Sequence, residues 1–184
     1  QIPLYGNLVI AKVDPVPDRL LTPVIMRCNP GSSEDATDIS GNPAKLQAMH
    51  EEQFVNPIRD AFDQLTTASE APRSPILESI QSINLTELQR GIAKGGSRRL
   101  IVASDLLQHT QEISFYKRTP DADALVESPA FGRVRTDLRG TEVELWMLQR
   151  SDFKSTQPRQ LPELWERIID AQGGKLMRVY TVSG

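Results

Sequence analysis

The segment Arg98–Asp105, with the sequence RRLIVASD, constrains the fold more than any other stretch of this chain. Two arginines precede the apolar run Leu100–Ala103, and Ser104 and Asp105 close it. A short apolar run of this kind is typical of a β-strand that is buried on both faces, as in a parallel sheet covered by helices. The run therefore predicts a strand in the middle of an α/β sheet. Because ligands of such sheets bind beyond the carboxyl ends of the strands, Ser104 and Asp105 mark the predicted position of a site.

Length, charge and cysteine content narrow the classes of protein to consider. A chain of 184 residues is long enough for one domain with a substantial core. The 21 basic and 24 acidic side chains give a formal net charge of -3 at pH 7, which offers no attraction to nucleic acid or to an anionic membrane. Cys28 is the only cysteine, so an internal disulfide is excluded. We therefore expect a single α/β domain, residues 1–184, that acts in the cytoplasm and binds neither nucleic acid nor membrane.

Two segments near the start of the chain are predicted to pair as antiparallel strands. Leu8–Val13 and Leu20–Met26 are rich in β-branched and apolar residues, and the proline-rich linker between them can continue neither a helix nor a strand. Pro23 has no backbone N–H to donate, which places the second of these strands at an edge of the sheet.

Two segments with helical periodicity follow these strands. After them, predicted strands alternate with a predicted helix. Apolar residues recur along Pro43–Thr66, with a kink expected at Pro57. Ser74 is positioned to cap a helix whose first residue is Pro75. After the central strand, the pattern predicts a strand, a helix and a strand: Thr141–Leu148, Leu161–Gln172 and Leu176–Val182. This order predicts a doubly wound, Rossmann-like, mostly parallel sheet with an antiparallel edge strand and helices on both faces.

Three features together resemble a bacterial von Willebrand factor type A (VWA)-like domain. They are the helix start Ser74–Glu78, the apolar strand that ends in Ser104 and Asp105, and the helix and strand within Leu161–Val182. The resemblance covers most of the chain at the level of element order. In that family a divalent cation, usually magnesium, is held at the strand ends in a metal-ion-dependent adhesion site. The resemblance implies that Ser74 supplies the hydroxyl of its second loop and Asp105 the carboxylate of its third.

The chain departs from the family pattern in its first metal-binding loop. The sequence contains no Asp-x-Ser-x-Ser motif, and Asp14, the nearest upstream candidate, has no hydroxyl neighbours. The resemblance then implies that Leu8–Met26 corresponds to the second and third strands of the family, and that the first strand and helix precede Gln1. Ser74 and Asp105 alone are too few ligands for Mg²⁺, so the missing loop or a carboxylate of a partner would complete a degenerate site. Alternatively, both residues are helix caps and bind no metal.

Three functions remain open on this basis. The first, which we carry forward, is a non-enzymatic module that binds another protein at the strand ends, with or without a shared Mg²⁺ ion. The second is a small α/β hydrolase or transferase that uses Ser104, Asp105 and His109, although the chain has no Gly-x-Ser-x-Gly nucleophile elbow. The third is a structural subunit without ligand chemistry.

Overall fold

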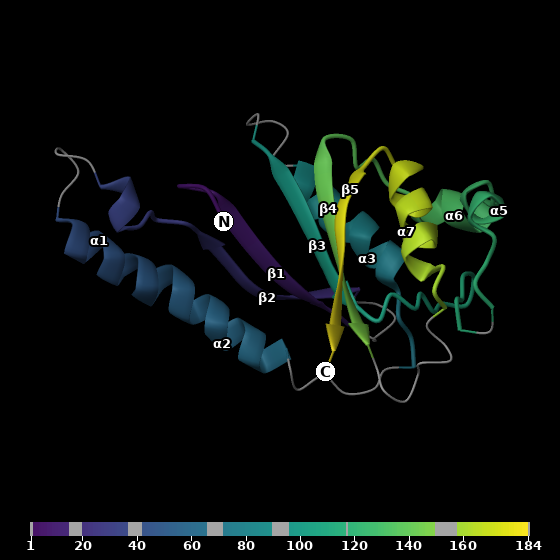
Figure 1. Cartoon of the computed structure of the whole chain (residues 1–184), viewed down its shortest axis with the longest axis horizontal. Helices are drawn as coiled ribbons and strands as arrows, with labels where there is room; N and C mark the ends of the chain where they lie inside the picture. The colour runs from purple at the N-terminus through teal and green to yellow at the C-terminus, as the bar shows by residue number, and fades with distance from the viewer. Residues whose placement is uncertain are drawn as a thin grey trace. The chain divides into compact units, whose positions relative to one another are not determined.

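The computed structural model describes residues 2–14, 20–36, 42–65, 72–89, 96–116, 118–149 and 158–183. The chain divides into two compact units, each described below by itself. The first contains a two-stranded antiparallel sheet and the second a three-stranded parallel sheet, so the fold is mixed α/β (Figure 1). Among the described residues, no helix has the length and apolar character needed to cross a membrane. The first unit consists of Gln1–Asp14 and Leu21–Glu70, and the second of Pro15–Leu20 and Ala71–Gly184.

The predicted antiparallel strand pair is confirmed in the first unit. Strand β1 (Asn7–Val13) pairs with β2 (Leu21–Cys28), and their register shifts between Ile10 and Ala11. Pro23 lies opposite Ala11 at this bulge, which is where a residue without a backbone N–H disturbs the ladder least. The linker between the two strands, residues 15–19, lies outside the described residues.

The predicted helix of the first unit begins at Pro43, as expected, and is interrupted close to Pro57. The Asn42 side chain caps it by accepting a hydrogen bond of 2.9 Å from the Ala44 N–H. The expected interruption takes the form of a π-helical turn that ends at Val55, two residues before Pro57, whose ring nitrogen has no N–H to donate. The elements are the 3₁₀ turn η1 (Ser33–Asp35), α1 (Pro43–His50), the π-helical turn η2 (Glu51–Val55) and α2 (Asn56–Leu65).

The sheet of the second unit has the order β3-β4-β5, with all strands parallel. β3 (Arg98–Ser104) is the predicted central strand, but it lies at an edge, and β4 (Thr141–Gln149) lies between β3 and β5 (Lys175–Ser183). The prediction of a central position was wrong because an apolar run shows that a strand packs against other residues, not how many strands pair with it. The alternation predicted for β4 is confirmed, since Val143 and Leu145 are fully buried while Glu142 is exposed.

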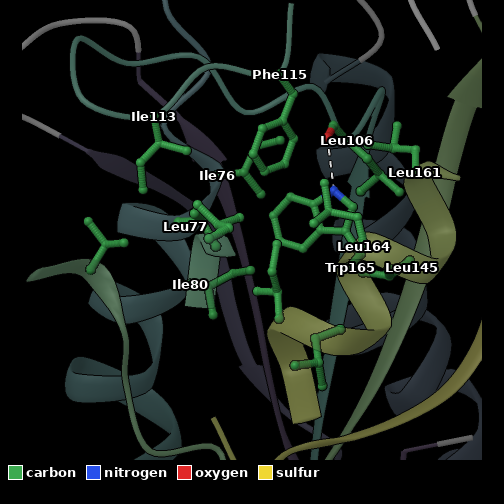
Figure 2. Packing of buried hydrophobic residues seen from close by; sticks show 14 of the residues in the cluster. Ile76, Leu77, Ile80, Leu106, Ile113, Phe115, Leu145, Leu161, Leu164 and Trp165 are labelled. Carbon is green, nitrogen blue, oxygen red and sulfur yellow. Dashed lines mark hydrogen bonds between the residues drawn. The ribbon is translucent and has the colours of Figure 1, made fainter. Parts of the chain in front are cut away.

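The helices of the second unit enclose one core around Trp165. The Trp165 ring lies 6.1 Å from that of Phe115 in an edge-on arrangement, and its Nε1–H donates a hydrogen bond of 2.9 Å to the Leu106 carbonyl (Figure 2). The sheet residues in this core, among them Leu145, all come from the same face of the sheet. The described helices of the second unit therefore cover one face of its sheet, where the sequence predicted helices on both faces (Figure 1). They are α3 (Ile76–Ile83), the π-helical turn η3 (Asn84–Leu88), α5 (Ala122–Val126), α6 (Pro129–Val134) and α7 (Leu161–Asp170).

Candidate functional site

The chain turns sharply at the carboxyl end of β3, and the two predicted site residues hold this turn. Leu106 is fully buried and has a φ of 61°, a left-handed conformation that is uncommon for leucine. The Leu106 N–H donates a 3.1 Å hydrogen bond to Ser104 Oγ, and the Leu107 N–H donates a 3.1 Å hydrogen bond to Asp105 Oδ1. Ser104 and Asp105 thus satisfy backbone groups of a strained turn. The alternative in which Asp105 caps a helix is wrong, because extended and turn segments follow β3 here.

Ser74 lies beside this turn, but it is not the predicted helix cap. Helix α3 begins at Ile76, and Pro75 occupies the cap position without any side-chain hydrogen bond to the helix. Ser74 instead forms a two-way backbone bridge with His109, with N–H to O distances of 2.9 and 2.8 Å. Because α3 begins at Ile76 and not at Pro75, Ser74 lies one residue before the cap position, which is why the predicted cap is wrong.

Gln108 supplies the helix cap that the sequence assigned to Ser74. Its side chain is fully buried, and its Oε1 accepts a 2.9 Å hydrogen bond from the Leu77 N–H in the first turn of α3. Its Nε2 donates a 2.9 Å hydrogen bond to Glu78 Oε2. Gln108 carries no capping signal in the sequence, because capping motifs are local and this cap comes from 31 positions away.

His109 forms a second polar pair in the same segment. Its Nδ1 lies 2.9 Å from Ser114 Oγ, and its ring packs 5.0 Å from that of Tyr116. Ser104 donates its own hydroxyl proton to Asp105 Oδ1 at 3.4 Å. The three residues of the hydrolase alternative therefore enter two hydrogen-bonded pairs, Ser104 with Asp105 and His109 with Ser114.

The donor set at the strand ends is small for a cation. Ser74 and Asp105, the two predicted ligands, lie in neighbouring segments linked by the bridge at His109. No group of three or more His, Cys, Asp and Glu side chains with metal-binding geometry occurs in the described part of the chain. Because Mg²⁺ prefers near-octahedral oxygen ligation, these residues fit a cation only if waters and an acid from elsewhere complete its shell.

The second face of the three-stranded sheet carries large exposed side chains. We define this open face by the side chains that point away from the core: Arg99, Ile101, Ala103, Glu142, Glu144, Trp146, Leu148, Arg178, Tyr180 and Val182. Ile101, Tyr180 and Val182 keep 46, 40 and 38% of their surface exposed. Trp146 and Tyr180 are register partners whose rings meet edge-on at 6.3 Å. The apolar side chains gather toward the carboxyl ends of the strands, next to Ser104.

Charged side chains mark the opposite, amino-terminal end of this face. Arg99 lies 3.5 Å from a Glu142 carboxylate oxygen and 3.9 Å from one of Glu144. Arg178 donates a 2.9 Å hydrogen bond to the Tyr180 hydroxyl, which raises the pKa of the guanidinium above its ordinary value. The open face therefore passes from an ionic to an aromatic and aliphatic surface along the strands.

A depression of about 420 Å³ lies between α7 and β5, and neither the turn after β3 nor the open face contributes to its lining. Its charged side chains include Glu163, Arg167, Asp170 and Lys175. Arg167 is engaged in ion pairs with Asp123 at 2.7 Å and with Asp170 at 3.6 Å, so the depression already has its own internal charge pairing.

Comparison of the chain with protein-family models, with curated proteins and with solved structures finds no match.

Proposed function

We propose that this chain is a non-enzymatic protein-interaction module of the VWA-like type, which binds a partner protein through its open face. The exposed aromatic and aliphatic side chains on a parallel sheet carry this proposal. Parallel sheets are almost always covered on both faces, because their strands lack the polar alternate positions that water would require. Here Ile101, Tyr180 and Val182 lie on the face opposite the helix-covered core.

The chemistry of the open face favours a protein as the ligand. Tyrosine, tryptophan and arginine are enriched among the residues that dominate binding at protein interfaces, and Trp146, Tyr180 and Arg178 lie together on this face. A doubly wound sheet needs a second helical layer on this side. We propose that an amphipathic helix of the partner supplies that layer, with its apolar side over Trp146 and Tyr180 and its charged end near Arg99 and Glu142.

Site-specific photo-crosslinking tests this proposal. A photoreactive residue at Tyr180 is expected to capture a partner protein from an extract of the source cells, whereas one at the exposed Glu163 on α7 serves as the matched control. The purified partner should then bind the chain in a saturable way. Tyr180→Lys should weaken binding about 10- to 100-fold, since burial of a large apolar side chain contributes about 1.5–3 kcal/mol. Equal capture at both positions, or unchanged affinity of Tyr180→Lys, would refute the proposal.

A bound cation is a separable part of the proposal. Ser74 and Asp105 would hold Mg²⁺ together with waters and a carboxylate of the partner, at the rim next to the open face. Asp105→Asn keeps an oxygen that accepts the Leu107 N–H but removes the charge, so it tests ligation without opening the turn. In calorimetry, the wild-type chain should bind the partner more weakly in EDTA than in Mg²⁺. Asp105→Asn should bind the partner in Mg²⁺ as weakly as the wild-type chain does in EDTA. If neither change alters affinity, binding needs no cation.

The pairing of His109 with Ser114 favours the hydrolase as the second candidate. A histidine nitrogen at 2.9 Å from a serine hydroxyl is the geometry of an activated nucleophile. Under this alternative, hydrolysis of p-nitrophenyl esters should be detectable and should be lost in both Ser114→Ala and His109→Asn. Ser104→Ala should retain it. Absence of hydrolysis by the wild-type chain would remove this candidate.

A further inference from the structure

The backbone along the free edge of β3 takes no part in the proposed function, although the side chain of Ile101 belongs to the open face. In the part of the chain that the structure describes, β3 pairs on one side only, with β4, in an uninterrupted register from Arg98–Thr141 to Ser104–Met147. On its other side, none of the described strands pairs with the backbone N–H and C=O groups of this strand of 7 residues. Such an edge is a template for pairing with another strand unless the sequence protects it.

The other described strand edges carry irregularities that β3 lacks, and the cations of β3, Arg98 and Arg99, lie only at its start. β5 has a register shift opposite Val143 and Glu144. β2 has Pro23 and a bulge. The middle of β3, Leu100–Ala103, has no proline, no bulge and no charge.

We propose that β3 pairs antiparallel with β3 of a second copy of this chain, with the twofold axis at Ile101. Residues directly opposite in an antiparallel pair point to the same face, so an axis at Ile101 joins core-facing Leu100 to Val102 of the copy and open-face Arg99 to Ala103. Only this register pairs all 7 residues of the strand while keeping the helices of both copies on one side. Two three-stranded sheets then become one continuous sheet.

Charge selects the antiparallel orientation. β3 begins with Arg98 and Arg99 and ends with Ala103 and Ser104. Parallel pairing in register would place the arginines of the two copies side by side, which is unfavourable for like charges directly opposite each other. Antiparallel pairing separates them by the length of the strand and sets each beside small, uncharged side chains.

Disulfide trapping tests the register directly. In a Cys28→Ser background, Ile101→Cys places one thiol opposite its own copy on the twofold axis, so oxidation should give a covalent dimer. Ala103→Cys is the matched control on the same face, and it should stay monomeric on a reducing-agent-free gel because it lies opposite Arg99 of the copy. A mixture of Ala103→Cys and Arg99→Cys chains should crosslink. If Ala103→Cys alone crosslinks as readily as Ile101→Cys, the register is wrong.

Light scattering after gel filtration tests the association itself. The mass that light scattering gives for the wild-type chain should be twice the 20.5 kDa of one copy. Ile101→Lys sets two cations opposite each other and should raise the dimer dissociation constant more than tenfold. Tyr180→Lys lies two strands away from the β3 edge and should leave the dimer intact while it weakens partner binding, so failure of one proposal is distinguishable from failure of the other. If the wild-type chain is monomeric both at high concentration and after 100-fold dilution, the inference is overturned.

Discussion

The cap that Gln108 places on helix α3 leads to a quantitative prediction. This buried amide connects the segment after β3 to the start of α3 through Leu77 N–H and Glu78 Oε2, each at 2.9 Å. Gln108→Met retains the volume of the side chain but removes both hydrogen bonds. Loss of a helix cap costs about 0.5–2 kcal/mol. Loss of a hydrogen bond to a charged group costs about 1.5–3 kcal/mol. Because Glu78 is half-buried and regains some water, we expect a total destabilisation of roughly 2–4 kcal/mol.

Urea unfolding followed by tryptophan fluorescence measures this change in the correct part of the chain. Both tryptophans, Trp146 and Trp165, belong to the second unit. With a slope of about 1–3 kcal/mol per molar urea, the midpoint should fall by about 1–2 M. Gln108→Glu keeps the acceptor for Leu77 but faces Glu78 with a second carboxylate, and it should also destabilise at pH 7. Adding Glu78→Gln should restore stability, since its amide then donates to the new carboxylate.

The role assigned to Gln108 fails under either of two results. One is a midpoint for Gln108→Met that stays close to that of wild type. The other is a double variant, Gln108→Glu with Glu78→Gln, that is no more stable than Gln108→Glu alone. In both cases the contacts at the start of α3 would contribute little to the stability of the second unit.

Further predictions concern single positions in the second unit. Gly132→Ala should stabilise it by about 0.5–1 kcal/mol in thermal unfolding, because Gly132 is helical and nothing lies within 4 Å of an added Cβ. Gly173→Ala should destabilise it by about 1–2 kcal/mol, because Gly173 has a φ of 75° and the Cβ would meet Arg139 at 2.6 Å. Hydrogen bonds from the Arg139 side chain and backbone lower the pKa of Asp137 from 3.8 to about 2, so Arg139→Gln should raise that pKa in an NMR titration. The stability that this pair contributes is present above pH 3.8 and is lost as the pH falls toward 2, so Arg139→Gln should flatten the acid limb of the stability profile. Trp165→Phe removes the buried hydrogen bond of the indole and should cost about 2 kcal/mol in urea unfolding followed by circular dichroism.

Local patterns in the sequence determined most of the elements. The alternation of Val143 and Leu145 with charged residues identified β4 because side chains of a strand point to opposite faces in turn. The apolar stripe that ends at Gly173 identified α7, and the structure gives that glycine a left-handed φ of 75°. These signals depend on residues a few positions apart, so they survive without knowledge of the tertiary structure.

Only the tertiary structure decided the order of the strands and the partners of the candidate site residues. The apolar run of β3 has the composition of a central strand, yet the strand lies at an edge because pairing depends on β4, some 40 residues further along the chain. Ser74 has the composition of a cap, yet a bridge to His109 holds it extended while Gln108 caps the helix. The sequence indicates whether each residue favours a buried or an exposed position. Which distant residues pair with each other depends on the free energy of the whole packed unit.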